Sequence, residues 1–493
     1  MSSAASDGRA RWFALAVLCL GSLMIVLDTT IVNVALPSIK KDLRFNETSL
    51  AWVVNGYLLT FGGFLLLGGR LGDLFGHRRL FLCGIALFTL ASLACGSATS
   101  QGALVAARLV QGFGGAIVSA VSLSLMVSLF REPDDRAKAM GVFGFVAAGG
   151  GTLGVLLGGI LTDLLTWHWI FLVNVPIGAG VAVLALRLLP AERVSGGPRR
   201  LDVAGAVTVT AALMLAVYAI VNGNQAGWTS ARTLGLLAAS AALFGGFVFV
   251  ESRTASPLVP LGLFRLRNLA TANAVGVLWA GAMFAWFFLS ALYLQLVLGY
   301  TPLQVGLAFL PANLIMGAFS LGISARLVMR FGVKLPLVAG LSLASAGLVL
   351  FARAPVGGDF LLDVLPSMTL LGFGAGIAFN PVLLAAMGDV EPSDSGLASG
   401  LVNTSFMMGG ALGLALLASI AASRTSHLLA SGLSRAAALD GGYHTAFLIG
   451  ALFAALAAVL GGLLLESRGG ATEPDRSPGM SADASRAQPE PGS

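Results

Sequence analysis

The sequence predicts an all-α membrane protein with fourteen transmembrane helices, arranged as two six-helix halves plus an inserted two-helix hairpin. Of the 493 residues, 57% are hydrophobic and only 11% are charged. Soluble domains carry about 25% charged residues, and a water-soluble core could not absorb this much apolar surface. The 64 glycines agree, because small residues let membrane helices pack closely.

A membrane-spanning helix needs about 20 mostly apolar residues. Segments that meet this length are found at 12–36, 50–69, 80–98, 102–129, 139–162, 169–189, 203–221, 233–250, 269–297, 303–325, 335–352, 360–387, 396–422 and 443–465. An even number of spans places both termini on one side. Of the 29 Lys and Arg residues, 21 then lie on that side, 7 on the other and Arg108 inside a span. This bias predicts a multi-pass protein of the cell membrane with both termini cytoplasmic.

The chain divides into five expected parts. Residues 1–11 form a cytoplasmic N-terminus, 12–190 the first six-helix half and 203–250 the inserted hairpin. Residues 269–466 form the second half, and the polar, Pro- and Ser-rich segment 467–493 is expected to be a disordered tail. A weak repeat, VQGFGGAI at 110–117 and LLGFGAGI at 370–377, supports duplicated halves, which in transporters enclose a substrate site between them.

The first span carries an aspartate, Asp28, near its centre. A carboxylate at this depth is costly unless it faces water, a partner or a proton, and burial disfavours its charged form. Asp28 is therefore a candidate proton carrier. The alternative is an aspartate that only joins helices by hydrogen bonds.

Arg108 is the one basic residue well inside a span, and Gln111 follows it one turn later on the same face. An arginine there must be paired or solvated. Arg108 could respond to the protonation of an acid, or it could form a static ion pair.

Two glycine-containing segments are expected to take part in gating. In GRLGDLFGHRR (69–79), Gly69 and Gly76 permit a tight turn, and Asp73 and Arg78 could form a latch that breaks as the protein opens. An ordinary positively charged loop is the alternative. In the fifth span, Gly154 and Gly158 lie on one face that allows very close helix contact.

Aromatic and amide side chains suggest where a substrate binds, since aromatic and methionine surfaces suit bulky apolar or cationic molecules. For any single aromatic residue, contact with lipid or another helix is the favoured explanation of the pattern. The candidate substrate-binding residues are Trp52, Asn55, Tyr57, Gln111, Trp279, Met283, Trp286, Tyr293, Asn313 and Asn403.

The sequence offers no support for an enzyme. It has no G-x-x-x-x-G-K phosphate-binding loop, and its four histidines are dispersed without metal-ligand spacing. We therefore expect no cofactor, no metal site and no nucleic-acid partner. The chain is expected to act as a monomer in the lipid bilayer.

Five motifs in order resemble the major facilitator superfamily, and within it the fourteen-helix drug:proton antiporter family. They are LDTTIVNVALP (27–37), AWVVNGYLLT (51–60), GRLGDLFGHRR (69–79), RLVQGFGGA (108–116) and WHWIFLVNVPIG (167–178). The resemblance covers almost the whole chain except the tail. In the fifth span, GGGTLGVLLGG (149–159) departs from the family's antiporter motif, because Val155 stands where that motif has proline.

The resemblance implies a proton-coupled secondary transporter that exports hydrophobic or amphipathic drugs or antibiotics by alternating access. Its partners would be protons and a small drug-like molecule, and the proton gradient would supply the energy. Two alternatives stay open. One is a facilitator or importer of a specific metabolite on the same fold, favoured by Val155, and the other is a membrane protein without transport activity.

Overall fold

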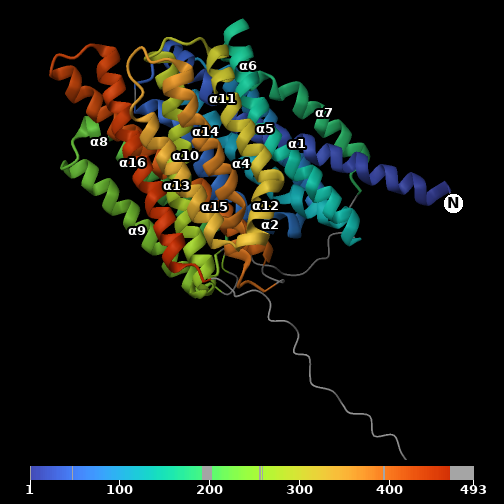
Figure 1. Cartoon of the computed structure of the whole chain (residues 1–493). Helices are drawn as coiled ribbons and strands as arrows, with labels where there is room; N and C mark the ends of the chain where they lie inside the picture. Colours follow the sequence, from blue (N-terminus) through green and yellow to red (C-terminus); the bar gives the residue numbers. More distant parts are fainter. Residues whose placement is uncertain are drawn as a thin grey trace, which may run out of the picture.

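The computed structural model describes residues 2–46, 48–130, 132–190, 202–254, 257, 259–391 and 395–466. Within these ranges the chain is a bundle of long helices that run up and down (Figure 1). The elements are α1 (Ser2–Leu43), η1 (Ser49–Ala51), α2 (Trp52–Phe75), α3 (His77–Gly96), α4 (Gln101–Leu129), α5 (Pro133–Leu164), α6 (Trp169–Leu172), α7 (Asn174–Leu188), α8 (Val203–Ala226), α9 (Ala231–Arg253), η2 (Leu261–Arg265), α10 (Arg267–Leu296), α11 (Pro302–Ala318), η3 (Phe319–Ile323), α12 (Ser324–Phe331), α13 (Lys334–Phe351), η4 (Phe360–Val364), α14 (Leu365–Met387), α15 (Ser395–Ala430) and α16 (Arg435–Leu464).

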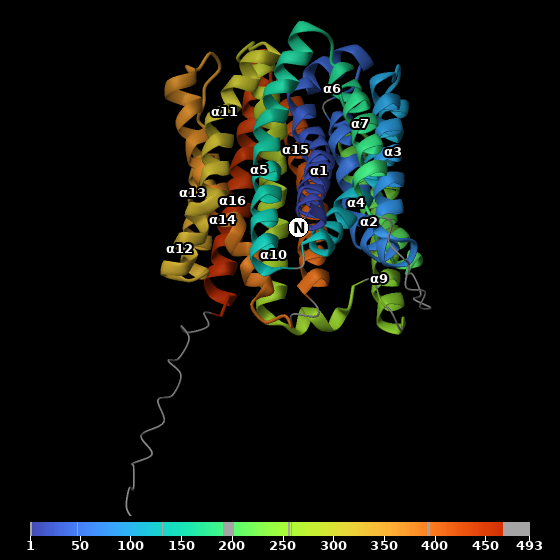
Figure 2. The same cartoon turned by 90° about the vertical axis from the view of Figure 1, so that its right-hand side faces the viewer.

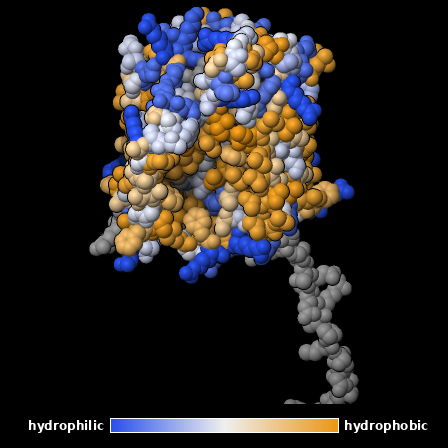
Figure 3. All heavy atoms as spheres, turned by 90° about the vertical axis from the view of Figure 1, so that its left-hand side faces the viewer, coloured by the Kyte–Doolittle hydropathy of each residue, from blue (hydrophilic) through white to orange (hydrophobic). Residues whose placement is uncertain are grey.

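The apolar surface of the bundle has the form expected for a membrane. In the described part of the chain, thirteen helical segments are long and apolar enough to cross a bilayer, and α11 is a shorter apolar helix. Hydrophobic side chains form a broad band around the middle of the face drawn in Figure 3, with hydrophilic residues above and below it. The predicted all-α membrane fold is confirmed.

Three predicted spans change helix type or restart in the structure, and one of them, expected at 360–387, begins with the π-helical turn η4 before α14. The span expected at 169–189 begins with the short helix α6, and α7 starts afresh at Asn174. The span expected at 303–325 consists of α11, the π-helical turn η3 and α12. Hydropathy reports only length and apolarity, so it does not detect such local changes in backbone hydrogen bonding. The expected tail at 467–493 lies outside the described residues.

We name the two ends of the bundle by their loops. The terminal face holds the α2–α3 turn at Gly76 and the end of α16, and the far face holds the α3–α4 and α10–α11 loops. Helices α1–α7 form the N-terminal half and α10–α16 the C-terminal half. The hairpin α8–α9 packs on the outside, where α8 contacts α2 and α15.

The halves meet mainly along two helix pairs, α2 with α15 and α5 with α11, with a smaller contact between α1 and α10. Figure 2 shows α5 between α1 on one side and α11 on the other. Near the far face, a Cβ on Gly306 of α11 would lie 3.0 Å from the Val155 carbonyl oxygen. The Gln295 side-chain amide also donates to the Val34 carbonyl of α1 at 2.8 Å. These contacts join the two halves near the far face.

Candidate functional site

A buried ion pair lies inside the N-terminal half. Asp28 of α1 accepts from Arg108 Nη1 of α4 at 2.5 Å. Asp28 is 0% and Arg108 1% exposed. Isolated charges at this depth would be strongly destabilising, so each requires the other together with further hydrogen bonds.

Three polar side chains complete the site around Asp28. Gln111 Nε2 donates to Asp28 Oδ1 at 2.7 Å and to Ser92 Oγ at 2.8 Å, while Gln111 Oε1 accepts from Arg108 Nη1 at 2.7 Å. Asn174 Nδ2, at the start of α7, donates to Asp28 Oδ1 at 3.2 Å. We call Asp28, Arg108, Gln111, Ser92 and Asn174 the polar cluster. Both carboxylate oxygens of Asp28 therefore have donors in the cluster.

Helix α2 also contacts Arg108, through a backbone carbonyl and an aromatic ring. Arg108 Nε donates to the Val53 carbonyl at 2.8 Å, and the guanidinium carbon lies 4.4 Å from the centre of the Tyr57 ring. Gly112 makes this approach possible, because any Cβ there would collide with the Tyr57 backbone. A residue larger than glycine would push α4 away from α2 and move Arg108 off its carbonyl.

The polar cluster draws on α1, α3, α4 and α7, all in the N-terminal half. Of its two charged groups, only Asp28 can change its charge by binding a proton. A carboxyl group can gain or lose a proton in the accessible pH range, whereas a guanidinium stays charged. Protonation of Asp28 would turn its ion pair with Arg108 into a much weaker neutral–charged contact.

The predicted gating loop is a sharp break between two helices. Gly76 has φ +88° and ends α2, so that α3 begins at His77. Arg78 Nη2 donates to the Leu186 carbonyl of α7 at 2.5 Å, which ties α3 to α7. No atom outside its own helix lies within 4 Å of a Cβ on Gly69. The side chain of Asp73 lies outside the described residues, so the predicted Asp73–Arg78 latch stays a prediction.

The glycines of α5 lie against α1. A Cβ on Gly154 would collide with Thr30 and with the Leu27 carbonyl, and one on Gly158 would collide with the Ile31 carbonyl. The next face of α5 contacts α11 instead, since a Cβ on Gly159 would meet the backbone at Pro302. α5 thus makes close backbone contact with the first helix and with the other half.

Most of the predicted substrate-binding side chains are buried in this conformation. Asn403 is exposed, and Trp52 and Met283 are partly buried. The buried ones are Asn55, Tyr57, Gln111, Trp279, Trp286, Tyr293 and Asn313. Gln111 belongs to the polar cluster, and its predicted contact with substrate stays a prediction. The Tyr293 hydroxyl donates to the Pro355 carbonyl at 3.0 Å.

Several of these buried residues have polar atoms without a hydrogen-bond partner. They are both side-chain amide atoms of Asn55, the Tyr57 hydroxyl and the indole nitrogens of Trp279 and Trp286. Buried polar groups are usually paired, so these atoms are exceptions among the buried residues that the structure describes. Sequence reasoning missed Ser92 and Asn174. The only signal was their polarity within apolar segments.

Comparison with known proteins agrees with this architecture. The model of the Major Facilitator Superfamily matches residues 18–414. The chain is 40% identical over 466 residues to the puromycin resistance protein pur8 of Streptomyces alboniger, covering 93% of this chain and 92% of that protein. It is 40% identical over 417 residues to the cephamycin export protein CmcT of Amycolatopsis lactamdurans, covering 84% and 85% of the two chains.

Among solved structures, an auto-inhibited peptide transporter of the POT family superposes with a TM-score of 0.64 at 18% identity, covering 92% of this chain and 96% of that one. At this identity the similarity concerns the fold alone. The family match and the two relatives decide the question of identity: the chain belongs to the Major Facilitator Superfamily and is a multi-pass membrane transporter, not an enzyme.

Proposed function

We propose that the protein exports hydrophobic or amphipathic drug-like molecules in exchange for protons. The relatives named above are a puromycin resistance protein and a cephamycin export protein, and both align over most of their length. We place the protein in the cell membrane with the terminal face towards the cytoplasm, because 21 of the 29 Lys and Arg residues then lie on that side.

The observation that carries the proton-coupling proposal is the fully buried pair of Asp28 and Arg108. Two opposite charges in one cluster give a site whose interactions change when a single proton binds. Protonated Asp28 no longer holds Arg108 by charge, so Arg108 and α4 are released relative to α1. Moving one charge through the membrane potential supplies about 2.3 kcal/mol per 100 mV.

Helix α5 offers a route from the proton site to the other half. α1 carries Asp28 on one face and packs against Gly154 and Gly158 of α5 with another. α5 in turn contacts Gly306 of α11. A shift of α1 on protonation would therefore displace α5 against α11, near the far face. In the same cycle, Asp73 and Arg78 would form a latch that breaks when the terminal face opens.

The substrate site is proposed between the halves. Asn55 of α2 and the two tryptophans of α10 supply unpartnered polar atoms from opposite halves, and Asn403 of α15 is already exposed. Indole rings with free N–H groups suit large, mostly apolar molecules that carry a few acceptors. When the far face opens, these groups would become available to such a substrate.

A facilitator or importer is the second candidate, favoured by one observation. Val155 occupies the position of the antiporter-motif proline, and its carbonyl lies at the contact with Gly306. A proline would remove a backbone hydrogen bond and kink α5 at this contact. The unkinked helix could permit transport without strict exchange.

The test is efflux from proteoliposomes with an imposed pH gradient, using puromycin as the first substrate. We compare the wild type with Asp28→Asn, and Asp163→Asn serves as the matched control because Asp163 is an exposed acid at the end of α5. Asp28→Asn should abolish gradient-driven transport but retain substrate binding, and the control should transport normally. Uphill transport by Asp28→Asn at the wild-type rate would refute the proton-carrier role. Wild-type flux that ignores the pH gradient would favour the facilitator.

A further inference from the structure

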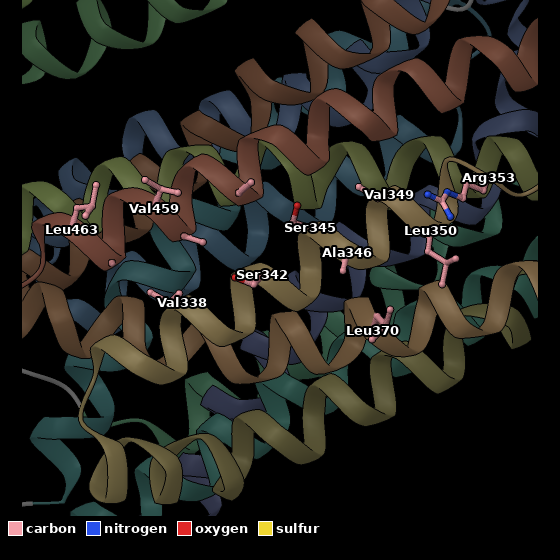
Figure 4. Close-up of a pocket in the computed structure, with 13 residues that line it drawn as sticks. Val338, Ser342, Ser345, Ala346, Val349, Leu350, Arg353, Leu370, Val459 and Leu463 are labelled. Carbon is pink, nitrogen blue, oxygen red and sulfur yellow. The ribbon is translucent and has the colours of Figure 1, made fainter.

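A groove of about 860 Å³ lies on the side of the C-terminal half, away from the polar cluster. It follows α13, with one wall from α16 and a contribution from Leu370 of α14 (Figure 4). The labelled side chains run from Val338 and Leu463 at one end, past Ser342 and Ala346, to Arg353 at the other. Its volume is within the range of small-molecule sites.

Small residues on both helices create this groove. α13 contributes Ser342 and Ala346, and α16 contributes Ala455, Ala458 and Gly462. Ser345, which also lines the groove, donates through Oγ to the Ala451 carbonyl at 2.8 Å and joins the two helices. From Val338 to the end of α13 at Phe351 the groove follows the helix for about 20 Å, at 1.5 Å per residue. This exceeds half of the roughly 30 Å hydrocarbon core, so it accommodates the acyl chain of one leaflet.

The single charged residue in the lining is Arg353, which is exposed two residues beyond the end of α13. This position is at the far face, where only 7 of the 29 Lys and Arg residues are expected. A guanidinium at the edge of the apolar band can bind a phosphodiester with paired N–H donors. The groove thus joins an apolar channel of acyl-chain length to an anion-binding group at headgroup depth.

We propose that this groove binds one anionic phospholipid from the leaflet that borders the far face. The acyl chain lies between α13 and α16, and the phosphate contacts Arg353. A drug-like substrate has no need of so long a channel. A protein helix would have to cover the cationic end, whereas an anionic lipid matches both the charge and the depth. The proposal is independent of proton coupling, because no residue of the polar cluster takes part.

The test is native mass spectrometry of the full-length protein released from detergent, titrated with phosphatidylglycerol or with phosphatidylcholine of the same acyl chains. Arg353→Gln removes the phosphate contact, and Ala346→Phe fills the groove. The matched controls are Arg424→Gln, an exposed arginine at the far end of α15, and Ala106→Phe, an exposed alanine on α4. A melting profile for each variant shows that it is folded.

The wild type should bind its first phosphatidylglycerol more tightly than phosphatidylcholine. Arg353→Gln should weaken that first binding step roughly tenfold, as for the loss of one charge-assisted hydrogen bond, and Ala346→Phe should remove it. Both controls should behave as the wild type. The proposal is overturned if Arg353→Gln and Arg424→Gln bind phosphatidylglycerol equally. Equal binding of the two lipids by the wild type would also overturn it, and either result is independent of transport.

Discussion

Replacing Asp28 by asparagine leaves the full positive charge of Arg108 in a site where both side chains are about 0–1% exposed. Removing one partner of a buried ion pair costs about 3–5 kcal/mol, because the remaining charge is desolvated and uncompensated. No screening discount applies, since neither side chain reaches solvent. Asp28→Asn should therefore lower the free energy of unfolding by about 3–5 kcal/mol at pH values where Asp28 of the wild type is ionised.

Arg108→Gln should behave differently, because the remaining partner can be neutralised. Arginine stays charged, but an unpaired Asp28 can take up a proton. The folded variant then holds one proton that the unfolded chain releases near neutral pH. Since the folded state binds more protons, its stability should fall as pH rises, by up to about 1.4 kcal/mol per pH unit. Arg108→Gln should thus approach wild-type stability at pH 5 and lose it towards pH 8.

The assay is equilibrium unfolding in mixed micelles at several pH values, for both single variants and the double variant. In the double variant two neutral amides face each other, so its loss should be smaller than the sum of the single losses by at least about 2 kcal/mol. A coupling near zero would refute the account of the ion pair. So would a pH slope in Asp28→Asn as steep as that of Arg108→Gln.

Two glycine substitutions test the backbone contacts. Gly154→Ala should lower stability by about 1–3 kcal/mol in the same assay, because the new methyl group meets Thr30 and the Leu27 carbonyl, whereas Gly144→Ala, in open space on the same helix, should be neutral or stabilising. An equal effect of the two would contradict the close contact between α1 and α5. Gly76→Ala should cost about 1–3 kcal/mol because φ is +88° there, and Gly69→Ala in the preceding helix should not; a stable Gly76→Ala would show that the turn has another conformation.

The sequence was sufficient to predict the fold class, because membrane spans follow from length and apolarity within one segment. It also singled out Asp28 and Arg108, since charges inside apolar segments are conspicuous one residue at a time. The family resemblance added the order of the spans. The match to the Major Facilitator Superfamily confirms that assignment.

The pairing within the site could not be predicted. Asp28 and Arg108 are 80 residues apart, and Asn174 is 146 residues from Asp28. Contacts at such separations depend on which helix faces meet, and a membrane helix is apolar on nearly all faces. For this reason the sequence did not reveal that the Gln111 amide contacts both Asp28 and Arg108. The broken span of α11 and α12 was missed for a related reason, because a π-helical turn leaves hydropathy unchanged.

The glycine contacts of α5 also determine how much of a displacement of α1 reaches α11. Between ordinary helices, side chains can change rotamer and absorb part of a displacement before the next helix responds. At Gly154, Gly158 and Gly159 backbone lies almost directly on backbone, so there is little side chain to deform. A displacement of α1 should therefore move α5 and α11 by nearly the same amount. A sub-ångström change at one carboxyl group then need not be lost before it reaches the opposite half.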